Sequence, residues 1–227
     1  MKRVGLLLPI IAVGCGAAGF FAYRQWTSST AEIKPVAASA ANNTIEADAV
    51  PPKLVVPETV PDIKLKDLSG KTHALAEFKG APTIYNFWAT WCAPCRREIP
   101  LLNELQTANR ADRLQIVGMA IDFRDDVQKF VATTPLNYSL LVGEEDGLDA
   151  AAKFGMEVVL PFSVFANSQG QIVAVKVGEL HRNEANAILA GIRSLEAGKL
   201  TLETARLQIS TRLHEISLER AAISSQK

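Results

Sequence analysis

The chain has 227 residues, of which 48% are hydrophobic, and its 24 basic and 24 acidic residues give a formal net charge of zero. This length allows one sizeable domain core with additional chain, and the balanced charge excludes the basic surface of a typical nucleic-acid-binding protein. Three cysteines and three scattered histidines are too few for a disulfide-stapled scaffold or a structural zinc site with four ligands. We therefore expect neither a metal site nor a cofactor.

Residues 1–26 form the first predicted segment, an N-terminal transmembrane anchor. Lys2 and Arg3 precede a stretch from Val4 to Tyr23 without any charged residue, long enough as a helix to cross the hydrocarbon core of a membrane. The basic residues are expected to stay in the cytoplasm. We therefore predict a single-pass protein of the inner (cytoplasmic) membrane with its folded domain in the periplasm. A cleaved secretory signal, or lipid attachment at Cys15, would place the domain in the same compartment.

Residues 27–60 form the second predicted segment, a Pro/Ala/Ser-rich linker. The segment contains few large apolar side chains and several prolines. Such a composition buries too little surface to offset the entropy of ordering the chain. We therefore expect a tether between the anchor and the folded domain.

Residues 61–197 are predicted to fold as one domain in which strands and helices alternate. The expected elements are a hairpin from 63–66 and 72–75, a strand at 83–89, a helix at 94–107, a strand at 114–121, a helix at 124–133, a strand at 138–142, a helix at 148–154, strands at 162–166 and 172–177, and a helix at 183–195. This order predicts an α/β fold with a mixed central sheet flanked by helices.

Residues 198–227 are predicted to form a C-terminal amphipathic helix. Leu202, Ile209, Ile216 and Ile223 recur at heptad spacing, which places them on one face. That face either docks on the surface of the domain or mediates self-association.

The run Cys92-Ala93-Pro94-Cys95 carries the chemistry, because it follows a predicted strand and opens a predicted helix. At the first turn of a helix, free backbone N–H groups and the helix dipole favour a thiolate on Cys92. Cys95 is one turn further along the same face, so the two sulfurs can join and separate. We predict a redox-active disulfide in which Cys92 attacks and Cys95 resolves the mixed disulfide. A static disulfide or half of a metal site is the alternative.

The segment from Asn86 to Pro100, Asn-Phe-Trp-Ala-Thr-Trp-Cys-Ala-Pro-Cys-Arg-Arg-Glu-Ile-Pro, resembles the active site of the TlpA/ResA-like branch of the thioredoxin-fold family. This branch includes the DsbE/CcmG cytochrome c biogenesis proteins. The resemblance covers roughly residues 61–195 and excludes the linker and the C-terminal helix. It implies a thioredoxin-like fold and a protein thiol–disulfide oxidoreductase activity.

Asn86 departs from thioredoxin itself, which has a buried aspartate at the corresponding strand position. Asparagine cannot take the proton of the resolving thiol, whereas Glu98, three residues after Cys95, offers a carboxylate near the same helix face. The ResA-like proteins resemble this chain in having a glutamate there. We assign Glu98 the transfer of the proton of Cys95, with a solvated surface acid as the alternative.

Leu160 and Pro161 precede the last hairpin, where the resemblance implies a cis proline that faces the cysteine pair. The backbone of Leu160 would then be free to pair briefly with an extended substrate segment. Trp91 lies beside Cys92 in the sequence and is expected to form part of the substrate-binding surface, whereas Trp88 is expected in the core.

The resemblance implies a periplasmic reductase of client proteins with cysteine pairs, such as apocytochrome c or copper-site proteins. A membrane electron donor of the DsbD/CcdA type would recharge it. A general oxidant or isomerase, and a non-enzymatic copper or haem chaperone that uses the same thiols, are the alternatives. A peroxidase is disfavoured, because Thr90 does not stand in the Thr-x-x-Cys arrangement of a peroxidatic site.

Overall fold

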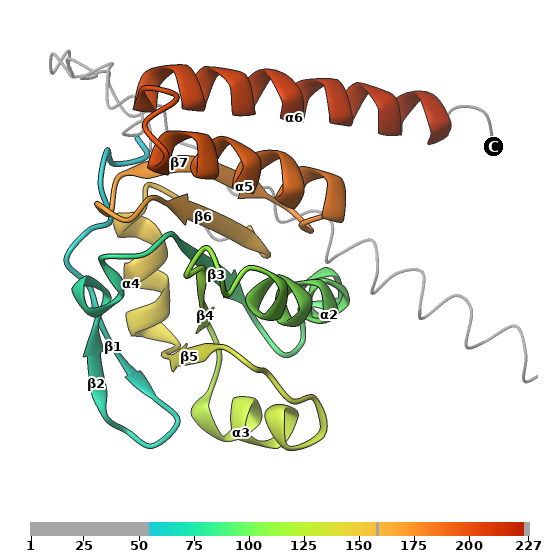
Figure 1. Cartoon of the computed structure of the whole chain (residues 1–227). Coiled ribbons are helices and arrows are strands. Elements are labelled where there is room, and N and C mark those ends of the chain that lie inside the picture. The colour runs from blue at the N-terminus through green and yellow to red at the C-terminus, as the bar shows by residue number, and fades with distance from the viewer. Residues whose placement is uncertain (1–54, 158, 225–227) are drawn as a thin grey trace, which may run out of the picture. The chain divides into compact units, whose positions relative to one another are not determined.

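The computed structural model describes residues 55–157 and 159–224 (Figure 1). Within these residues, one mixed sheet has the strand order β2-β1-β5-β4-β3-β6-β7. Its strands are β1 (Lys64–Asp67), β2 (Thr72–Ala74), β3 (Thr83–Trp88), β4 (Gln115–Ala120), β5 (Ser139–Val142), β6 (Phe162–Ala166) and β7 (Ile172–Val177). The helices are η1 (Leu75–Phe78), α2 (Ala93–Ala108), α3 (Arg124–Thr133), α4 (Glu145–Lys153), α5 (Arg182–Glu196) and α6 (Leu202–Ser224).

The strands and α-helices of the α/β domain agree with the sequence prediction in kind and order, whereas η1, which begins at the predicted strand residue Leu75, was not predicted. The largest shift in a boundary is in α4, which begins at Glu145 instead of Leu148. Glu145 and Asp146 occupy its first turn, where the helix dipole favours acidic side chains. The predicted anchor and most of the predicted linker lie outside the described residues. No helix within 55–157 and 159–224 has the length and apolar character needed to cross a membrane.

Strand pairing brings three loops together at one end of the sheet. β3 and β4 are parallel, with Trp88 opposite Ala120, whereas β6 is antiparallel to β3, with Phe162 opposite Phe87. The carboxyl ends of β3 and β4 therefore lie beside the amino end of β6. This end of the sheet carries the segments that follow β3 and β4 and the segment that precedes β6.

Both faces of the sheet are covered, which explains why every residue of β3 is buried. Tyr85 and Phe87 face the side of α4, where the ring of Phe87 stacks on Phe162 at 4.2 Å between centroids and meets Phe154 edge-on. Ile84 and Trp88 face the opposite side and pack with residues of α2, α3 and α5. The core therefore has two layers, one on each side of the sheet.

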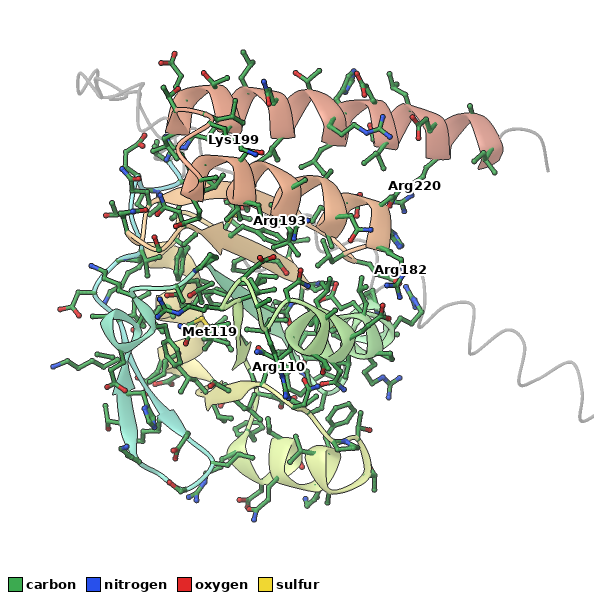
Figure 2. All side chains as sticks on the ribbon, viewed as in Figure 1. Arg110, Met119, Arg182, Arg193, Lys199 and Arg220 are labelled. Atoms are coloured by element: carbon green, nitrogen blue, oxygen red, sulfur yellow. A yellow bond between two sulfur atoms is a disulfide. The ribbon has the colours of Figure 1, made fainter. Side chains whose placement is uncertain are left out.

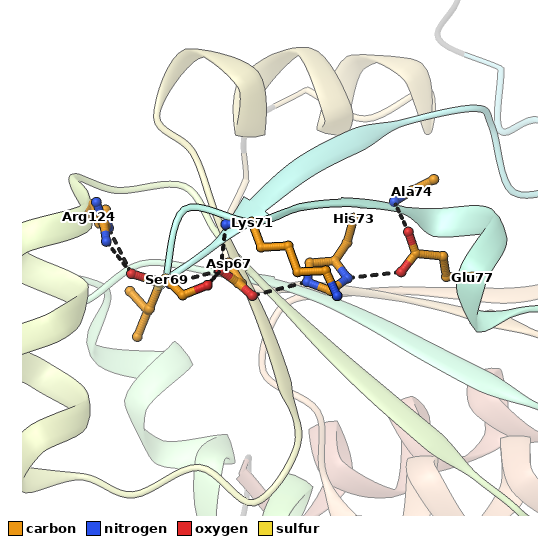
Figure 3. Close-up of polar contacts among 8 residues, drawn as sticks. Asp67, Ser69, Lys71, His73, Ala74, Glu77 and Arg124 are labelled. Carbon is orange, nitrogen blue, oxygen red and sulfur yellow. Dashed lines mark hydrogen bonds and ion pairs between the residues drawn. The ribbon is translucent and has the colours of Figure 1, made fainter.

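The β1–β2 hairpin is fixed by a histidine held between two carboxylates (Figure 3). His73 Nε2 lies 3.0 Å from Asp67 Oδ2, and its Nδ1 lies 2.9 Å from Glu77 Oε2. These hydrogen bonds raise the pKa of His73 above its ordinary value. The guanidinium of Arg124 donates to the backbone carbonyl of Leu68, which joins the hairpin to α3.

Strand β7 is held at its first residue by segments distant in the sequence. The backbone N–H of Ile172 donates to the carbonyl of Glu58 at 2.9 Å, and Thr59 forms a β-bridge with Gln171. Arg206 of α6 donates to the carbonyl of Ile172 and also pairs with the carboxylate of Glu58. Residues 58–60, which the sequence assigns to the linker, thus lie against the sheet.

Helix α6 runs back along α5 as the second arm of a helical hairpin (Figure 1). Ile209 and Ile216 are buried, and a Cβ on Gly191 of α5 would lie 2.6 Å from side-chain atoms of Ile209. The glycine therefore permits the close approach of the two helices. Docking on the domain, the first of the two alternatives, is confirmed. The expected stripe is wrong at its end, because Ile223 is 62% exposed.

Candidate redox site

Cys92 and Cys95 form a disulfide at the start of α2, with their Cα atoms 5.3 Å apart. Cys92 is the N-cap residue of the helix, and Pro94 occupies the first turn, as its fixed φ angle favours. The backbone N–H of Cys95 donates to Sγ of Cys92 at 3.3 Å. The same N–H can stabilise a thiolate on Cys92 when the disulfide opens.

The two cysteines differ in their access to solvent. Cys92 keeps 5% of its surface exposed, whereas Cys95 is fully buried. An incoming thiol or disulfide therefore reaches Cys92 first, which supports its assignment as the attacking residue and Cys95 as the resolving one. Trp91, immediately before Cys92, is 68% exposed and thus lies on the surface that a substrate would meet.

Glu98 lies on the same buried face of α2 as Cys95, and only 2% of its surface is exposed. The surface-acid alternative is therefore wrong. The side-chain amide of Asn86 donates to Oε1 of Glu98 at 2.7 Å, and the backbone N–H of Leu180 donates to Oε2 at 2.6 Å. Asn86 also donates to Ser163 Oγ at 3.0 Å, which fixes the amide between β6 and α2.

Burial raises the pKa of Glu98 from 4.5 to about 7, although the hydrogen bonds from Leu180 and Asn86 lower it in part. A carboxyl group with this pKa exchanges a proton near neutral pH, which suits a general acid and base. Glu98 therefore has the burial and the pKa that the assigned proton-transfer role requires.

Two further polar groups lie in the core on the α2 side of the sheet. Trp88 is buried, as predicted, and neither its Nε1 nor Oη of Tyr138 has a hydrogen-bond partner within the described part of the chain. A Cβ on Gly118 would lie 3.0 Å from Cε2 of Tyr138 and 3.2 Å from Nε1 of Trp88. Burial and the charge of Glu98 raise the pKa of Tyr138 above its usual range.

The peptide bond between Leu160 and Pro161 is cis, as the resemblance implies. The side chain of Leu160 packs against the cluster that contains Cys92 and Cys95, which places this loop beside the disulfide. The carbonyl of Pro161 accepts a hydrogen bond from Gly178 at 2.8 Å. Among the described residues, no hydrogen bond engages the backbone of Leu160, so its N–H and C=O are available to a substrate strand.

Asp122, which the sequence reasoning missed, anchors the loop that carries the disulfide. Its Oδ2 accepts hydrogen bonds from the backbone N–H and the hydroxyl of Thr90 at 2.9 and 2.5 Å. Its Oδ1 accepts a hydrogen bond from the N–H of Phe123 at 2.8 Å. The signal was available, because Asp122 directly follows the strand predicted at 114–121.

The comparisons with known proteins agree with this geometry. A family model described as "AhpC/TSA family" matches residues 56–175. The thiol-disulfide oxidoreductase ResA of Geobacillus thermodenitrificans is 28% identical over 141 residues, which cover 62% of this chain and 79% of the relative. The thioredoxin-like protein YneN of Bacillus subtilis is 32% identical over 131 residues, covering 56% and 74%. The crystal structure of a DsbF homologue from Corynebacterium diphtheriae is similar with a TM-score of 0.52 and 26% identity, covering 58% of this chain and 85% of that one.

Proposed function

The chain belongs to the AhpC/TSA family and is a thioredoxin-like thiol–disulfide oxidoreductase, and from this premise we propose that it is a membrane-tethered, extracytoplasmic reductase of client protein disulfides. The observation that carries the proposal is the arrangement of an accessible Cys92, a buried Cys95 and a buried Glu98 at the start of α2. Clients are proteins with cysteine pairs, such as apocytochrome c or copper-site proteins.

The reaction begins with the reduced enzyme, in which Cys92 has released its proton to solvent and is a thiolate, while Cys95 is a thiol. The thiolate of Cys92 attacks one sulfur of the client disulfide, and the other client sulfur leaves as a thiolate that takes up a proton. Cys95 then loses its proton to the carboxylate of Glu98, and its thiolate attacks the sulfur of Cys92. This step releases the second client thiolate, which is protonated in turn, and forms the Cys92–Cys95 disulfide. Two electrons have passed to the client.

The surface around Cys92 supports a protein client. Trp91, Phe123 and Val159 are large apolar side chains that remain exposed. They lie on the loops that follow β3 and β4 and precede β6, so they share the end of the sheet that carries the disulfide. Exposed apolar groups around a reactive sulfur favour an extended polypeptide over a small polar thiol.

The point at which the chain joins the domain supports the tethered arrangement. Val60 donates a backbone hydrogen bond to Gly170, which lies in the turn between β6 and β7. Since β6 and β7 are antiparallel, this turn is at the opposite end of the sheet from Pro161. Val60 therefore meets the sheet at the end away from Cys92, which is compatible with a tether that leaves Cys92 accessible. The oxidised enzyme would receive electrons from a membrane dithiol donor of the DsbD/CcdA type.

A Cys95→Ser variant expressed in native membranes tests the proposal. Without the resolving thiol, the mixed disulfide between Cys92 and the client should accumulate, and mass spectrometry would identify the partner. Cys92→Ser is the matched control and should trap nothing. If Cys95→Ser also accumulates no adduct, the reduction of client proteins is the wrong function.

The reduction potential tests the direction of electron flow. A value near that of thioredoxin, about −270 mV, is expected for a reductase, whereas a value near that of DsbA, about −120 mV, would indicate an oxidant. Equilibration of the full-length chain with glutathione buffers would measure this value.

A further inference from the structure

We propose that Arg220 of α6 is a positioning residue for the redox reaction: it holds Glu184 at the start of α5 and thereby keeps the backbone N–H of Leu180 on the carboxylate of Glu98. The inference rests on the proposed role of Glu98 in proton transfer. It assigns to the C-terminal helix, which lies outside the resemblance to the TlpA/ResA-like proteins, a part in the chemistry of the site.

The first step is the contact between α6 and α5. Nη1 of Arg220 lies 3.1 Å from Oε1 of Glu184, and Figure 2 shows the arginine side chain reaching from α6 toward the end of α5 that carries Arg182. Only 6% of the Glu184 side chain is exposed. Nζ of Lys176 in β7 lies 3.6 Å from the same oxygen. A buried carboxylate needs such partners, since an unpaired charge in the interior is strongly unfavourable.

The second step runs from Glu184 to the chain that precedes α5. Oε2 of Glu184 accepts a hydrogen bond at 2.9 Å from the backbone N–H of His181, the N-cap residue of the helix. This bond fixes the backbone at the start of α5. Because one oxygen of Glu184 binds Arg220 and the other binds the N-cap, the position of α6 sets the position of the cap.

The third step is the hydrogen bond into the redox site. Leu180 directly precedes His181, and its N–H donates to Oε2 of Glu98 at 2.6 Å. Leu180 is itself buried, with its side chain in the core beside α2 and α5. A shift of the α5 cap therefore moves the N–H of Leu180 relative to the Glu98 carboxylate.

Other groups also act on Glu98. On β3, Asn86 donates to its Oε1, while the carboxylate of Glu179 raises its pKa and the ammonium of Lys176 lowers it. Glu179 is in turn paired with Arg97 on α2. The phenol of Tyr138, before β5, lies within the field of Glu98. Among these groups, Lys176 is paired with Glu184, and Leu180 directly precedes His181, which is hydrogen-bonded to Glu184. A change at Arg220 therefore acts on the pKa of Glu98 through Leu180 and Lys176.

Removal of Arg220 should raise the pKa of Glu98. The hydrogen bond from Leu180 favours the carboxylate over the protonated acid, so a looser bond favours the acid. We expect an upward shift of about one pH unit for Arg220→Gln, the size associated with weakening one hydrogen bond to a charged group. Arg220→Lys keeps the positive charge, so the pKa of Glu98 should rise less in this variant than in Arg220→Gln.

The experiment titrates Glu98 in the oxidised full-length chain labelled with ¹³C at glutamate carboxyls, with Glu98→Gln used to assign the resonance. Arg212→Gln is the matched control, because Arg212 is on the same helix and pairs with Glu215 and Glu219 of that helix. Thermal unfolding of each variant is recorded in parallel. The expected result is a higher pKa of Glu98 in Arg220→Gln, an intermediate one in Arg220→Lys, and no change in Arg212→Gln.

An unchanged pKa of Glu98 in Arg220→Gln, even with a lower melting temperature, would overturn the inference and leave Arg220 with a purely structural role. If Arg220→Gln does not fold, Glu184→Gln removes the carboxylate that Arg220 holds, and an unchanged pKa of Glu98 in that variant overturns the inference equally. The titration needs no client protein. A shifted pKa in a chain that traps no client would therefore support the inference and contradict the proposed function.

Discussion

The amide nitrogen of Asn86 in β3 lies 2.7 Å from Oε1 of Glu98 in α2, so a non-titrating side chain orients the buried acid beside the cysteine pair. Asn86 also donates to Ser163 Oγ, and the N–H of Leu180 donates to the other oxygen of Glu98. Glu98 thus offers the proton of the resolving thiol an acceptor whose pKa, about 7, is close to neutral pH.

The burial of Glu98 predicts that the chain loses stability as the pH rises. The pKa of Glu98 is raised from 4.5 to about 7 on folding, so the folded state binds the proton more tightly. The stabilising effect is complete below pH 4.5 and is lost as the pH rises through 7. Its size is about 3 kcal/mol. In Glu98→Gln this pH dependence should disappear.

Urea unfolding of the oxidised chain and of Glu98→Gln at pH 5 and pH 8 measures this effect. The variant should gain stability relative to the parent chain on going from the lower to the higher pH. In the reduced enzyme, the same substitution should slow the resolving step near neutral pH. Equal pH dependence in both proteins would contradict the burial of an ionisable acid at this position.

Asp122 is predicted to stabilise the loop that carries the disulfide. Asp122→Ala removes the acceptor for the N–H and hydroxyl of Thr90 and for the N–H of Phe123. These donors are only partly buried, so each costs less than the roughly 1–3 kcal/mol of a fully buried unpaired group, and we expect a total loss of about 2 kcal/mol in the free energy of unfolding. Asp122→Asn keeps one oxygen and should lose less. Denaturant unfolding compares the two, and equal stabilities would refute the assignment.

His73 in the β1–β2 hairpin predicts a second pH dependence of the stability, independent of that of Glu98. Hydrogen bonds to Glu77 and Asp67 raise the pKa of His73 above its ordinary 6.5, so the folded state favours the protonated ring. This contribution is complete below pH 6.5 and is lost as the pH rises through the raised value. The difference in melting temperature between the parent chain and His73→Gln should therefore be larger at pH 5.5 than at pH 9. A difference that grows with pH would reverse the assignment.

Gly118 is predicted to be required for the packing of two aromatic rings. A Cβ at this position would lie 3.0 Å from Tyr138 and 3.2 Å from Trp88. Gly118→Ala should therefore cost about 1–3 kcal/mol, as overpacked cores do. Tyr138→Leu removes the nearest ring, so the double variant should lose less stability than the two single changes together. Additive losses in the unfolding free energy would show that the rings adapt without strain.

The sequence predicted the elements well because their signals are local. Apolar runs mark the buried strands, and Cys92, Pro94 and the preceding strand mark the start of α2. The burial of Glu98 follows in part from its spacing to Cys95. Its partner Leu180 could not be predicted, because it lies 82 positions away and donates through its backbone.

For the C-terminal helix, the heptad spacing predicted a buried face but not what that face packs against. Docking on the domain and self-association bury the same stripe, so heptad spacing could not choose between them. The contact of Ile209 with Gly191 decides in favour of docking, and it depends on a residue of another helix that carries no side chain. The pairing of Arg220 with Glu184 likewise depends on the antiparallel placement of α5 and α6.

The two edge strands of the sheet, β2 and β7, affect the tendency of the protein to aggregate at high concentration. Unprotected edge strands expose backbone groups that pair with other molecules and lead to aggregation. Here β2 has only three residues. At the first residue of β7, the N–H of Ile172 donates to the carbonyl of Glu58, and the carbonyl of Ile172 accepts from Arg206. The short β2 and the contacts to Ile172 therefore leave less backbone free for edge-to-edge pairing, and α6 contributes to this through Arg206.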